Sequence, residues 1–177
     1  MAELTRKELI LAIAAVASEA ELRLAGLDLS DLDLRGLCLK NANLQAANLQ
    51  RVNLADANLQ AANLQDADLT GADLFQANLQ IAQLEGAILD HANLERANLT
   101  EAQLQNATLR GASLRHANLR QADFCTANLE NADLRESNLE QTNFQQVNLQ
   151  SANLEGALFK ATRMPDGSVF GREQPIA

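Results

Sequence analysis

The chain has 177 residues, a formal net charge of −9, and neither tryptophan nor tyrosine. A chain of this length can bury a core, but its five phenylalanines require that core to be mainly aliphatic. The acidic excess argues against a generic basic surface for nucleic acid. No apolar run approaches the roughly 18 residues that a membrane span needs. Two cysteines are too few for a disulfide framework and favour a reducing compartment, so we expect a cytoplasmic protein.

Residues 1–21 lack the periodicity of the rest of the chain. Thr5 followed by Glu8 is a capping-box pattern, which is typical of a helix start. Apolar residues then follow at helical spacing, namely Leu9, Ile13, Val16, Ala17 and Ala20. We therefore predict one helix over about residues 6–20, with Thr5 as its N-cap.

The same segment has an alternative interpretation as a signal peptide within residues 1–17. Arg6 and Lys7 precede an apolar stretch that ends in an A-x-A sequence at Ala15–Ala17. That interpretation would mean export. Glu3 and Glu8 cancel the positive start, and the apolar stretch is short, so the helix is favoured.

A strict five-residue repeat occupies residues 22–162. A leucine or phenylalanine stands at every fifth residue from Leu24 to Phe159, in 28 consecutive positions. A period of five matches neither a helix nor a flat strand. It is compatible with a coil that turns a corner every five residues and points its leucine and alanine inward. Four such sides close a square of about 20 residues, and stacked coils would pair at about 4.8 Å spacing.

Residues four repeats apart should then stack on one another. Two of the core aromatic residues, Phe124 and Phe144, are separated by four repeats. On the outside, Asp90, Arg110 and Glu130 alternate in charge at the same spacing. Opposite charges on neighbouring rungs of a sheet contribute about 0.2–1 kcal/mol per pair. The sequence therefore supports a register in which each coil contains four repeats.

Both ends of the repeat are distinct. The first four small inward positions hold leucine instead of alanine, at Leu22, Leu27, Leu32 and Leu37. An open end of a stack needs a cap, and the helix within residues 1–21 is the expected lid for this wide coil. At the other end, Pro165-Asp166-Gly167 predicts a tight turn within a short C-terminal tail, residues 163–177, that folds Val169 and Phe170 over the last coil.

The repeat A-(N/D)-L-x-x resembles the pentapeptide-repeat protein family. Good copies are Ala57-Asn58-Leu59, Ala67-Asp68-Leu69 and Ala122-Asp123-Phe124. The resemblance implies an all-β, right-handed quadrilateral β-helix of about seven coils, which would be roughly 34 Å long. It also implies that Asn and Asp satisfy backbone groups at the turns. Six glycines share the slot two residues after the leucine, which suits corners where some turns need a positive φ.

We expect no catalytic, metal or cofactor site. His91 and His116 are five repeats apart, so they lie one coil and one face apart and do not converge on an ion. Cys38 and Cys125 are more than four coils apart, too far for a disulfide in this fold. The sequence has no glycine-rich phosphate loop, and a closed aliphatic rod offers no deep cleft. We therefore predict a non-catalytic scaffold or protein–protein interaction module.

The candidate partner surface is the stretch from Val52 to Glu95, which has acidic residues and no lysine or arginine. The candidate residues are Asp56, Asp66, Asp68, Asp73, Phe75, Ile81, Glu85, Asp90 and Glu95. Some pentapeptide-repeat proteins mimic duplex DNA and bind type II topoisomerases, so the resemblance implies a gyrase inhibitor or protector as an alternative function. The net charge of −9 is less than half of the roughly 20 charges on DNA of this length. An ordinary solvated surface therefore also remains open.

A pair of substitutions tests the inward and outward assignment. Replacing the inward Leu99→Asp buries an unpaired charge and should largely unfold the rod. Replacing the outward Gln80→Asp should cost little. Thermal melting of both variants distinguishes the positions, and equal losses of melting temperature would contradict the assignment.

Overall fold

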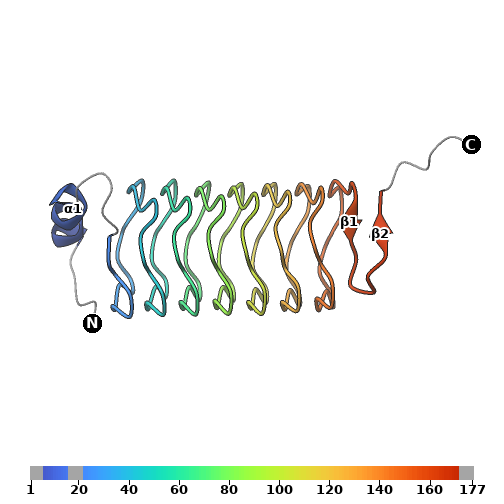
Figure 1. Ribbon diagram of the computed structural model, residues 1–177, viewed down its shortest axis with the longest axis horizontal. Helices are drawn as coiled ribbons and strands as arrows, with labels where there is room; N and C mark the ends of the chain where they lie inside the picture. The colour runs from blue at the N-terminus through green and yellow to red at the C-terminus, as the bar shows by residue number, and fades with distance from the viewer. Residues whose placement is uncertain (1–5, 16–21, 172–177) are drawn as a thin grey trace, which may run out of the picture.

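The computed structural model describes residues 6–15 and 22–171. Most of the described chain forms a β-helix whose coils follow one another along the long axis (Figure 1). Helix α1, Arg6–Ala15, lies at the N-terminal end. Two short strands, β1 (Thr162–Arg163) and β2 (Val169–Phe170), lie at the other end. No helix among the described residues is long and apolar enough to cross a bilayer.

Parallel bridges between residues four repeats apart set the register of the coils. Four repeats therefore complete one turn, and each turn contributes one rung to each of four ladders. The first ladder runs from Arg23 to Arg163, the second from Asp28 to Asn148, the third from Asp33 to Asn153 and the fourth from Cys38 to Leu158. Each face of the coil is defined by one ladder: it comprises every residue of that ladder and the three residues that follow each of them in the chain.

The sides of the coil are very short strands. Each repeat places one residue in a bridge, with turns before and after it. The backbone bonds link successive coils: the Leu99 N–H, for example, donates to the Asn118 carbonyl at 2.8 Å. The all-β prediction is therefore correct, and the sheet is built from single rungs between corners.

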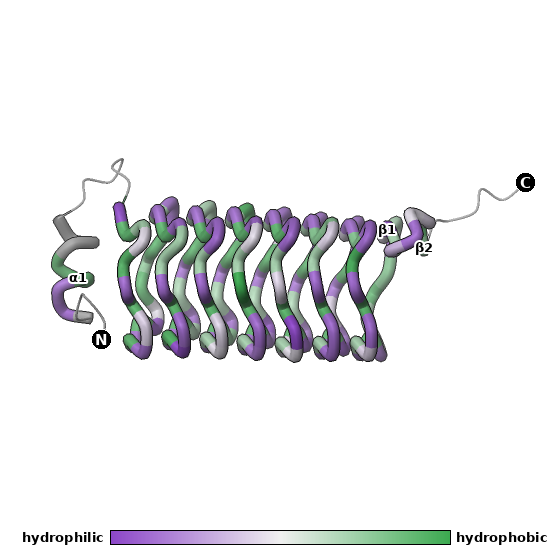
Figure 2. Tube along the Cα trace, turned by 90° about the horizontal axis from the view of Figure 1, so that it is seen from below, coloured by the Kyte–Doolittle hydropathy of each residue, from purple (hydrophilic) through white to green (hydrophobic). Residues whose placement is uncertain are grey.

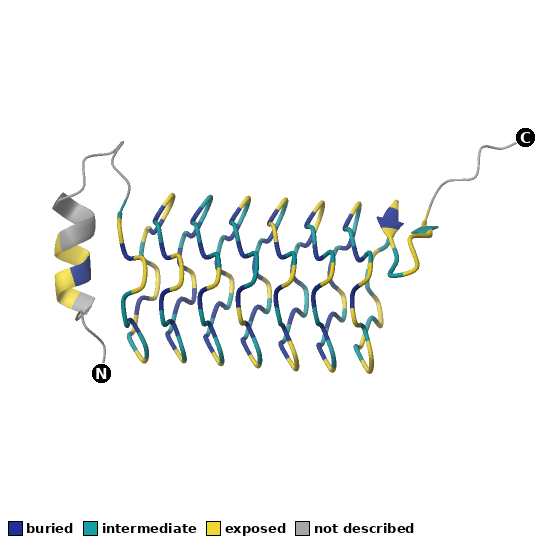
Figure 3. Cartoon of the chain, turned by 60° about the horizontal axis from the view of Figure 1, so that its bottom comes forward, coloured by how far each residue is buried: buried dark blue, intermediate teal, exposed yellow. Residues whose placement is uncertain are grey.

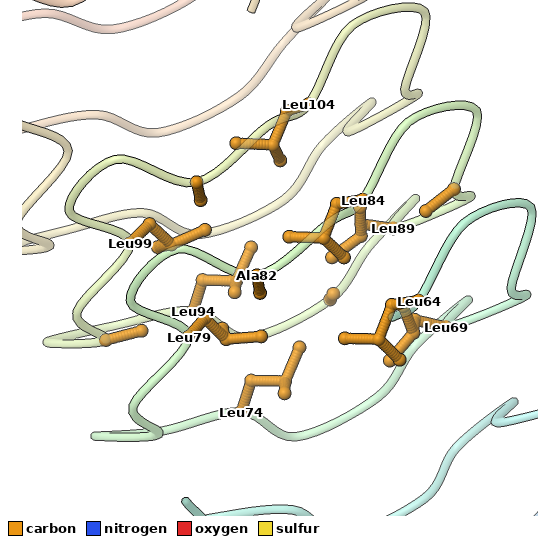
Figure 4. Packing of buried hydrophobic residues seen from close by; sticks show 14 of the residues in the cluster. Leu64, Leu69, Leu74, Leu79, Ala82, Leu84, Leu89, Leu94, Leu99 and Leu104 are labelled. Atoms are coloured by element: carbon orange, nitrogen blue, oxygen red, sulfur yellow. The ribbon is translucent and has the colours of Figure 1, made fainter. Parts of the chain in front are cut away.

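Leucine and phenylalanine side chains fill the interior of the stack. Every residue of the five-residue series from Leu24 to Phe144 is at most 2% exposed. Leucines four repeats apart, such as Leu64 and Leu84, stack in successive coils (Figure 4). Apolar and polar positions alternate around each coil (Figure 2), as do buried and exposed ones (Figure 3). Full burial of one such side chain stabilises by about 1.5–3 kcal/mol, so the core is the main source of stability.

The exceptions to an all-aliphatic core are accommodated by contacts within it. The Phe124 and Phe144 rings lie 5.4 Å apart, which confirms that residues four repeats apart stack. Ser137 and Thr142 occupy alanine positions and are fully buried. Their hydroxyls donate to the carbonyls of Leu134 and Leu119 at 2.7 and 2.8 Å. Because buried polar groups are costly only when unpaired, these substitutions fit the fold.

The corners share one backbone conformation. The residue two places after each core leucine or phenylalanine has a positive φ in all 28 repeats. The six glycines in this slot were correctly predicted, but the expectation was too narrow, because every non-glycine residue in the slot also has a positive φ. The Asn or Asp before the leucine supports the corner: Asn53 Oδ1, for example, accepts a hydrogen bond from the Ala55 N–H at 3.1 Å.

At the N-terminal end, helix α1 is described only to Ala15, so residues 16–20 and the predicted cap Thr5 lie outside the described residues. The A-x-A sequence of the signal-peptide interpretation lies partly outside them as well. Within α1, Leu9 is fully buried and belongs to the same core cluster as the repeat leucines. Ile10 and Leu11 are exposed. The four leucines of the first coil, from Leu22 to Leu37, are partly buried against that core.

At the C-terminal end, the first ladder continues into β1 through the bridge between Asn143 and Arg163. The turn around Asp166 follows, as predicted, with the Gly167 N–H donating to the Met164 carbonyl at 2.9 Å. Strand β2 then pairs antiparallel with β1. The Phe170 ring packs edge-on against Phe159, with 5.1 Å between centroids. The hairpin thus lies against the last coil.

Two exposed isoleucines separate the cost of a positive φ from that of losing a side chain. Ile81 has φ +52° and is 41% exposed, whereas Ile88 lies in a bridge and is 40% exposed. A β-branched residue is strained at positive φ and glycine is not. We expect Ile81→Gly to raise the free energy of unfolding by roughly 0.5–1 kcal/mol and Ile88→Gly to lower it by about 1 kcal/mol. Denaturant titration measures both, and a loss of stability in both variants would argue against strain at Ile81.

Candidate interaction surface

Among the described residues, no group of three or more His, Cys, Asp or Glu could hold a metal ion. His116 Nδ1 lies 3.3 Å from Glu136 Oε2 on the third face, whereas His91 follows Ile88 of the second ladder. Cys38 and Cys125 are free thiols on the outside of the rod. The outer faces are therefore where a function of this rod has to be sought.

The candidate partner residues from Asp56 to Glu95 span about two turns of the coil, so the structure distributes them around it. The third face carries Asp56, Asp73, Phe75 and Glu95, the second carries Asp68 and Asp90, the first carries Asp66 and Glu85, and the fourth carries Ile81. A continuous acidic stretch in the sequence is thus not one continuous patch in space. Six of the nine residues nevertheless lie on two neighbouring faces, the second and the third.

The third-face group is held together by direct contacts. The Asp56 N–H donates to the Phe75 carbonyl at 2.8 Å, which places these two residues on adjacent coils at one corner. Arg96 lies over the Phe75 ring, 6.0 Å from its centroid, and 3.9 Å from the Glu95 carboxylate. Phe75 is consequently partly buried, and it stands beside a cation as well as beside acids.

Asp68 and Asp73 have structural roles in their turns. Asp68 accepts hydrogen bonds from the Thr70 N–H and hydroxyl at 3.0 and 2.6 Å and from the Gln50 amide. Burial raises the pKa of Asp68, but these hydrogen bonds outweigh it and hold the pKa below its ordinary value. Asp73 accepts from the Phe75 N–H at 3.1 Å and from the Asn93 amide at 2.9 Å. Both carboxylates mainly stabilise the backbone.

The remaining candidate acids differ in exposure. Asp56 and Asp66 are exposed, whereas Glu85, Asp90 and Glu95 are half-buried. Asp90 Oδ1 accepts from the Arg110 backbone N–H at 2.9 Å, and the Arg110 side chain lies 3.8 Å from Glu130. Of the alternating charges predicted for this column, Arg110 and Glu130 form an ion pair, whereas Asp90 contacts the backbone of Arg110 and not its guanidinium.

Charge is distributed unevenly around the rod: two neighbouring faces carry an excess of acid along its length, and the other two do not. This asymmetry is not evident in the linear sequence. On the second and third faces, twelve carboxylates outnumber six arginines. The acids there are Asp28, Asp31, Asp33, Asp56, Asp68, Asp73, Asp90, Glu95, Glu130, Asp133, Glu136 and Glu155, and the arginines are Arg35, Arg51, Arg96, Arg110, Arg115 and Arg135. On the first and fourth faces six carboxylates nearly match five cations. These are Asp66, Glu85, Glu101, Asp123, Glu140 and Asp166, with Arg23, Lys40, Arg120, Lys160 and Arg163.

The less charged half is rich in amides instead. The fourth ladder has asparagine on five successive rungs, from Asn58 to Asn138. The Asn78 amide donates to Asn58 Oδ1 at 3.4 Å, and the Asn98 amide donates to Asn78 Oδ1 at 3.3 Å. Sorting the charged residues by their position within a four-repeat coil would have revealed this asymmetry from the sequence, whereas their linear density did not.

Comparison with known proteins identifies the family. The model of the family described as pentapeptide repeats matches eight copies, over residues 38–76, 77–115, 109–146 and 127–160. The chain belongs to the pentapeptide repeat family. No curated protein matches the chain in a sequence comparison.

Solved structures that resemble the chain are also pentapeptide repeat or resistance proteins. HetL, described as involved in regulating heterocyst differentiation in the cyanobacterium Nostoc sp. strain PCC 7120, is 28% identical over 94% of this chain and 100% of its own, with TM-score 0.34. QnrB1, a plasmid-mediated fluoroquinolone resistance protein, is 15% identical over 82% of this chain and 74% of its own, with TM-score 0.49. A protein from the Arabidopsis thaliana thylakoid lumen is 22% identical over 73% and 77%, with TM-score 0.26.

The ion pair of Asp133 and Arg135, on the third face, is expected to control the titration of Asp133. The Arg135 guanidinium donates to both Asp133 oxygens, at 2.9 and 2.6 Å, and holds the pKa of Asp133 below its ordinary value. Because the pKa of Asp133 is lower in the folded state than in the unfolded state, its carboxylate stabilises the fold at pH values above its unfolded-state pKa. This stabilisation is lost as the pH falls through the folded-state pKa. Arg135→Gln should raise the pKa of Asp133, and the loss of stability at low pH that comes from protonating Asp133 should then disappear.

Carboxyl carbon NMR titration of Asp133 measures this shift directly. Arg110→Gln is the matched control, because Arg110 lies on the second face beside Glu130 and should leave Asp133 unchanged. An Asp133 pKa that is the same in the Arg135→Gln variant and the unsubstituted protein would contradict the assignment.

Proposed function

We propose that this protein is a non-catalytic scaffold that binds a protein partner through its outer faces. The observation that carries the proposal is the closed aliphatic interior, in which every core position from Leu24 to Phe144 is at most 2% exposed. A filled interior leaves polar chemistry only on the outside. Regular, nearly flat faces with side chains at fixed spacing suit extended binding surfaces in repeat proteins.

The proposed partner surface is the acidic half of the rod, which includes six of the nine candidate residues. Of these, Asp56, Asp90 and Glu95 supply the carboxylates for a partner, and Phe75 supplies an apolar contact on the third face, which it shares with Asp56 and Glu95. Complementary charge steers association, so we expect a partner with a basic surface. Asp66, Ile81 and Glu85 lie on the other two faces and have a secondary role in this proposal.

Affinity capture from the native host, with two matched charge-reversal variants, tests the proposed surface. Asp56→Lys with Glu95→Lys reverses charge on the third face, and Asp66→Lys with Glu85→Lys reverses the same number of charges on the first face. We expect the third-face variant to lose the partner and the first-face variant to keep it. If both variants retained the partner equally well, the acidic half would not be the binding surface.

A second candidate function is a DNA mimic that binds a type II topoisomerase such as gyrase and inhibits or protects it. The excess of acid on two neighbouring faces of a rod favours it. The excess is small beside the roughly one charge per 1.7 Å of duplex DNA, which is why this candidate ranks second. A gyrase supercoiling assay with and without the protein tests it, and neither inhibition nor protection at high micromolar protein would count heavily against it.

We also propose the finer description of the fold: a right-handed quadrilateral β-helix of about seven coils over residues 22–162, capped by residues 1–21 and followed by the tail 163–177. The four-repeat register supports four sides. The burial of Leu9 within the repeat core supports the capping role of α1. A cytoplasmic location is proposed with it, and export would follow if residues 1–17 act as a signal peptide.

A further inference from the structure

The ladder residue before each core leucine or phenylalanine is asparagine or aspartate throughout residues 43–153, except in one segment at mid-length. The exceptions all fall within residues 83–113, in the green to yellow middle of the rod (Figure 1), and they are Gln83, Ile88, Gln103, Thr108 and Ser113. Bridges pair Gln83 with Gln103 and Ile88 with Thr108. Four of the five exceptions are therefore neighbours on two adjacent coils. Departures from a local rule of a fold are expected where the chain has a function.

These exceptions leave backbone donors without the acceptor that other corners provide. On the first ladder, Asn63 Oδ1 accepts the Gln65 N–H at 3.0 Å. On the next two rungs a glutamine replaces the asparagine, and the N–H groups of Glu85 and Gln105 have no hydrogen-bond partner within the described part of the chain. The Asp90 N–H, which follows the isoleucine of the second ladder, has none there either. Three donors on two adjacent coils thus depend on solvent or on a ligand.

We call residues 83–90 and 103–110 the corner patch, because they surround the corner between the first and second faces on two adjacent coils. Gln103 is exposed and Gln83 is half-buried, and neither amide bonds to another described residue. Ile88 is 40% exposed. A carboxamide presents a donor and an acceptor in one plane, so two such amides on neighbouring rungs match the N–H and C=O groups of a peptide chain.

The charge and composition of the corner patch narrow the class of ligand. Glu85 and Asp90 are acidic, and Arg110 is the one cation of its sequence. Asp66 adds a third carboxylate, because a Cβ on Gly86 would lie 2.5 Å from Asp66 Oδ1, which places this carboxylate over the corner. An acidic surface disfavours phosphate groups and nucleic acid. The patch also has no aromatic residue on which a base or a sugar ring could stack.

We propose that the corner patch binds an extended peptide segment that carries apolar and basic residues. Carbonyl groups of the segment accept the unpaired N–H groups, and its peptide groups pair with the amides of Gln83 and Gln103. An apolar side chain of the segment contacts Ile88, and a basic one lies beside Glu85 and Asp90. Main-chain hydrogen bonds then supply affinity and side-chain contacts supply specificity. The site is separate from the third-face surface proposed above, so that either proposal can fail without the other.

A library of short random peptides displayed on phage tests the proposal. The full chain is the target, and the double variant Gln83→Asn with Gln103→Asn is the counter-selection. The double variant keeps both amides and the net charge, but its shorter side chains can accept the chain's own Glu85 and Gln105 N–H groups. We expect selected peptides rich in apolar and basic residues. As synthetic peptides in fluorescence anisotropy, they should bind the double variant at least about tenfold more weakly than the unsubstituted chain.

The same double variant has a second expected effect that a folding defect cannot produce. Each restored hydrogen bond should raise the melting temperature by roughly 2–4 °C, so the variant is more stable and yet binds less. Gln60→Asn with Gln80→Asn is the matched control, because it makes the same change on adjacent rungs of the fourth face, outside the patch. The control should leave both the peptide affinity and the melting temperature unchanged.

Amide hydrogen exchange measured by NMR locates the contact. In the free chain the N–H groups of Glu85, Asp90 and Gln105 should exchange faster than that of Gln65, and saturation with a selected peptide should slow them. Slow exchange in the free chain would show that these donors are already paired and would overturn the proposal. So would a library with no sequence enriched over the counter-selection, or an equal loss of affinity in the control pair. Binding of cellohexaose that the Gln83→Asn with Gln103→Asn variant abolishes would assign the patch to a saccharide instead.

Discussion

The structure depends on the alignment of each coil with the next at a spacing of four repeats. This register places the core leucines over one another and pairs their backbone groups at the same time, as in the bond from Leu99 to Asn118. A shift by one residue would bring polar side chains into the interior along every coil at once. The core and the ladder therefore enforce each other, and a chain with no helix in its body and only single-residue rungs forms a long stack.

The corner conformation is the local counterpart of this register. A positive φ at one slot in every repeat turns the chain through a corner, and the Asn or Asp side chain three places before it accepts the backbone N–H that the corner leaves free, as Asn58 does for Gln60 at 3.1 Å. Most of the residues in this slot are not glycine, and each of those is held in a conformation that it does not prefer. The ladder bonds on either side supply the stabilisation that holds it there.

Sequence reasoning predicted the inward positions, the stacking of Phe124 on Phe144 and the turn before Gly167, because each of these follows from periodicity or from local turn chemistry. It did not predict that every corner has a positive φ, because a positive φ is inferred from a sequence mainly where a glycine stands, and most corners have another residue. It grouped Asp56 to Glu95 by proximity along the chain, whereas the coil separates them onto different faces. It also could not foresee that Arg135 contacts Asp133, its near neighbour in the chain, since long side chains choose between partners at similar distances.

The four-repeat register also governs how such a chain can change in length. Insertion or deletion of four whole repeats lengthens or shortens the stack and leaves each later side chain pointing in its former direction. Insertion of a single repeat preserves the core pattern equally well, yet it turns everything beyond it by one side, so that one of the two acid-rich faces of one segment would adjoin an amide-rich face of the next. Gain or loss of repeats in steps of one is thus a route by which a rod of this kind can exchange one binding surface for another without disturbing its interior.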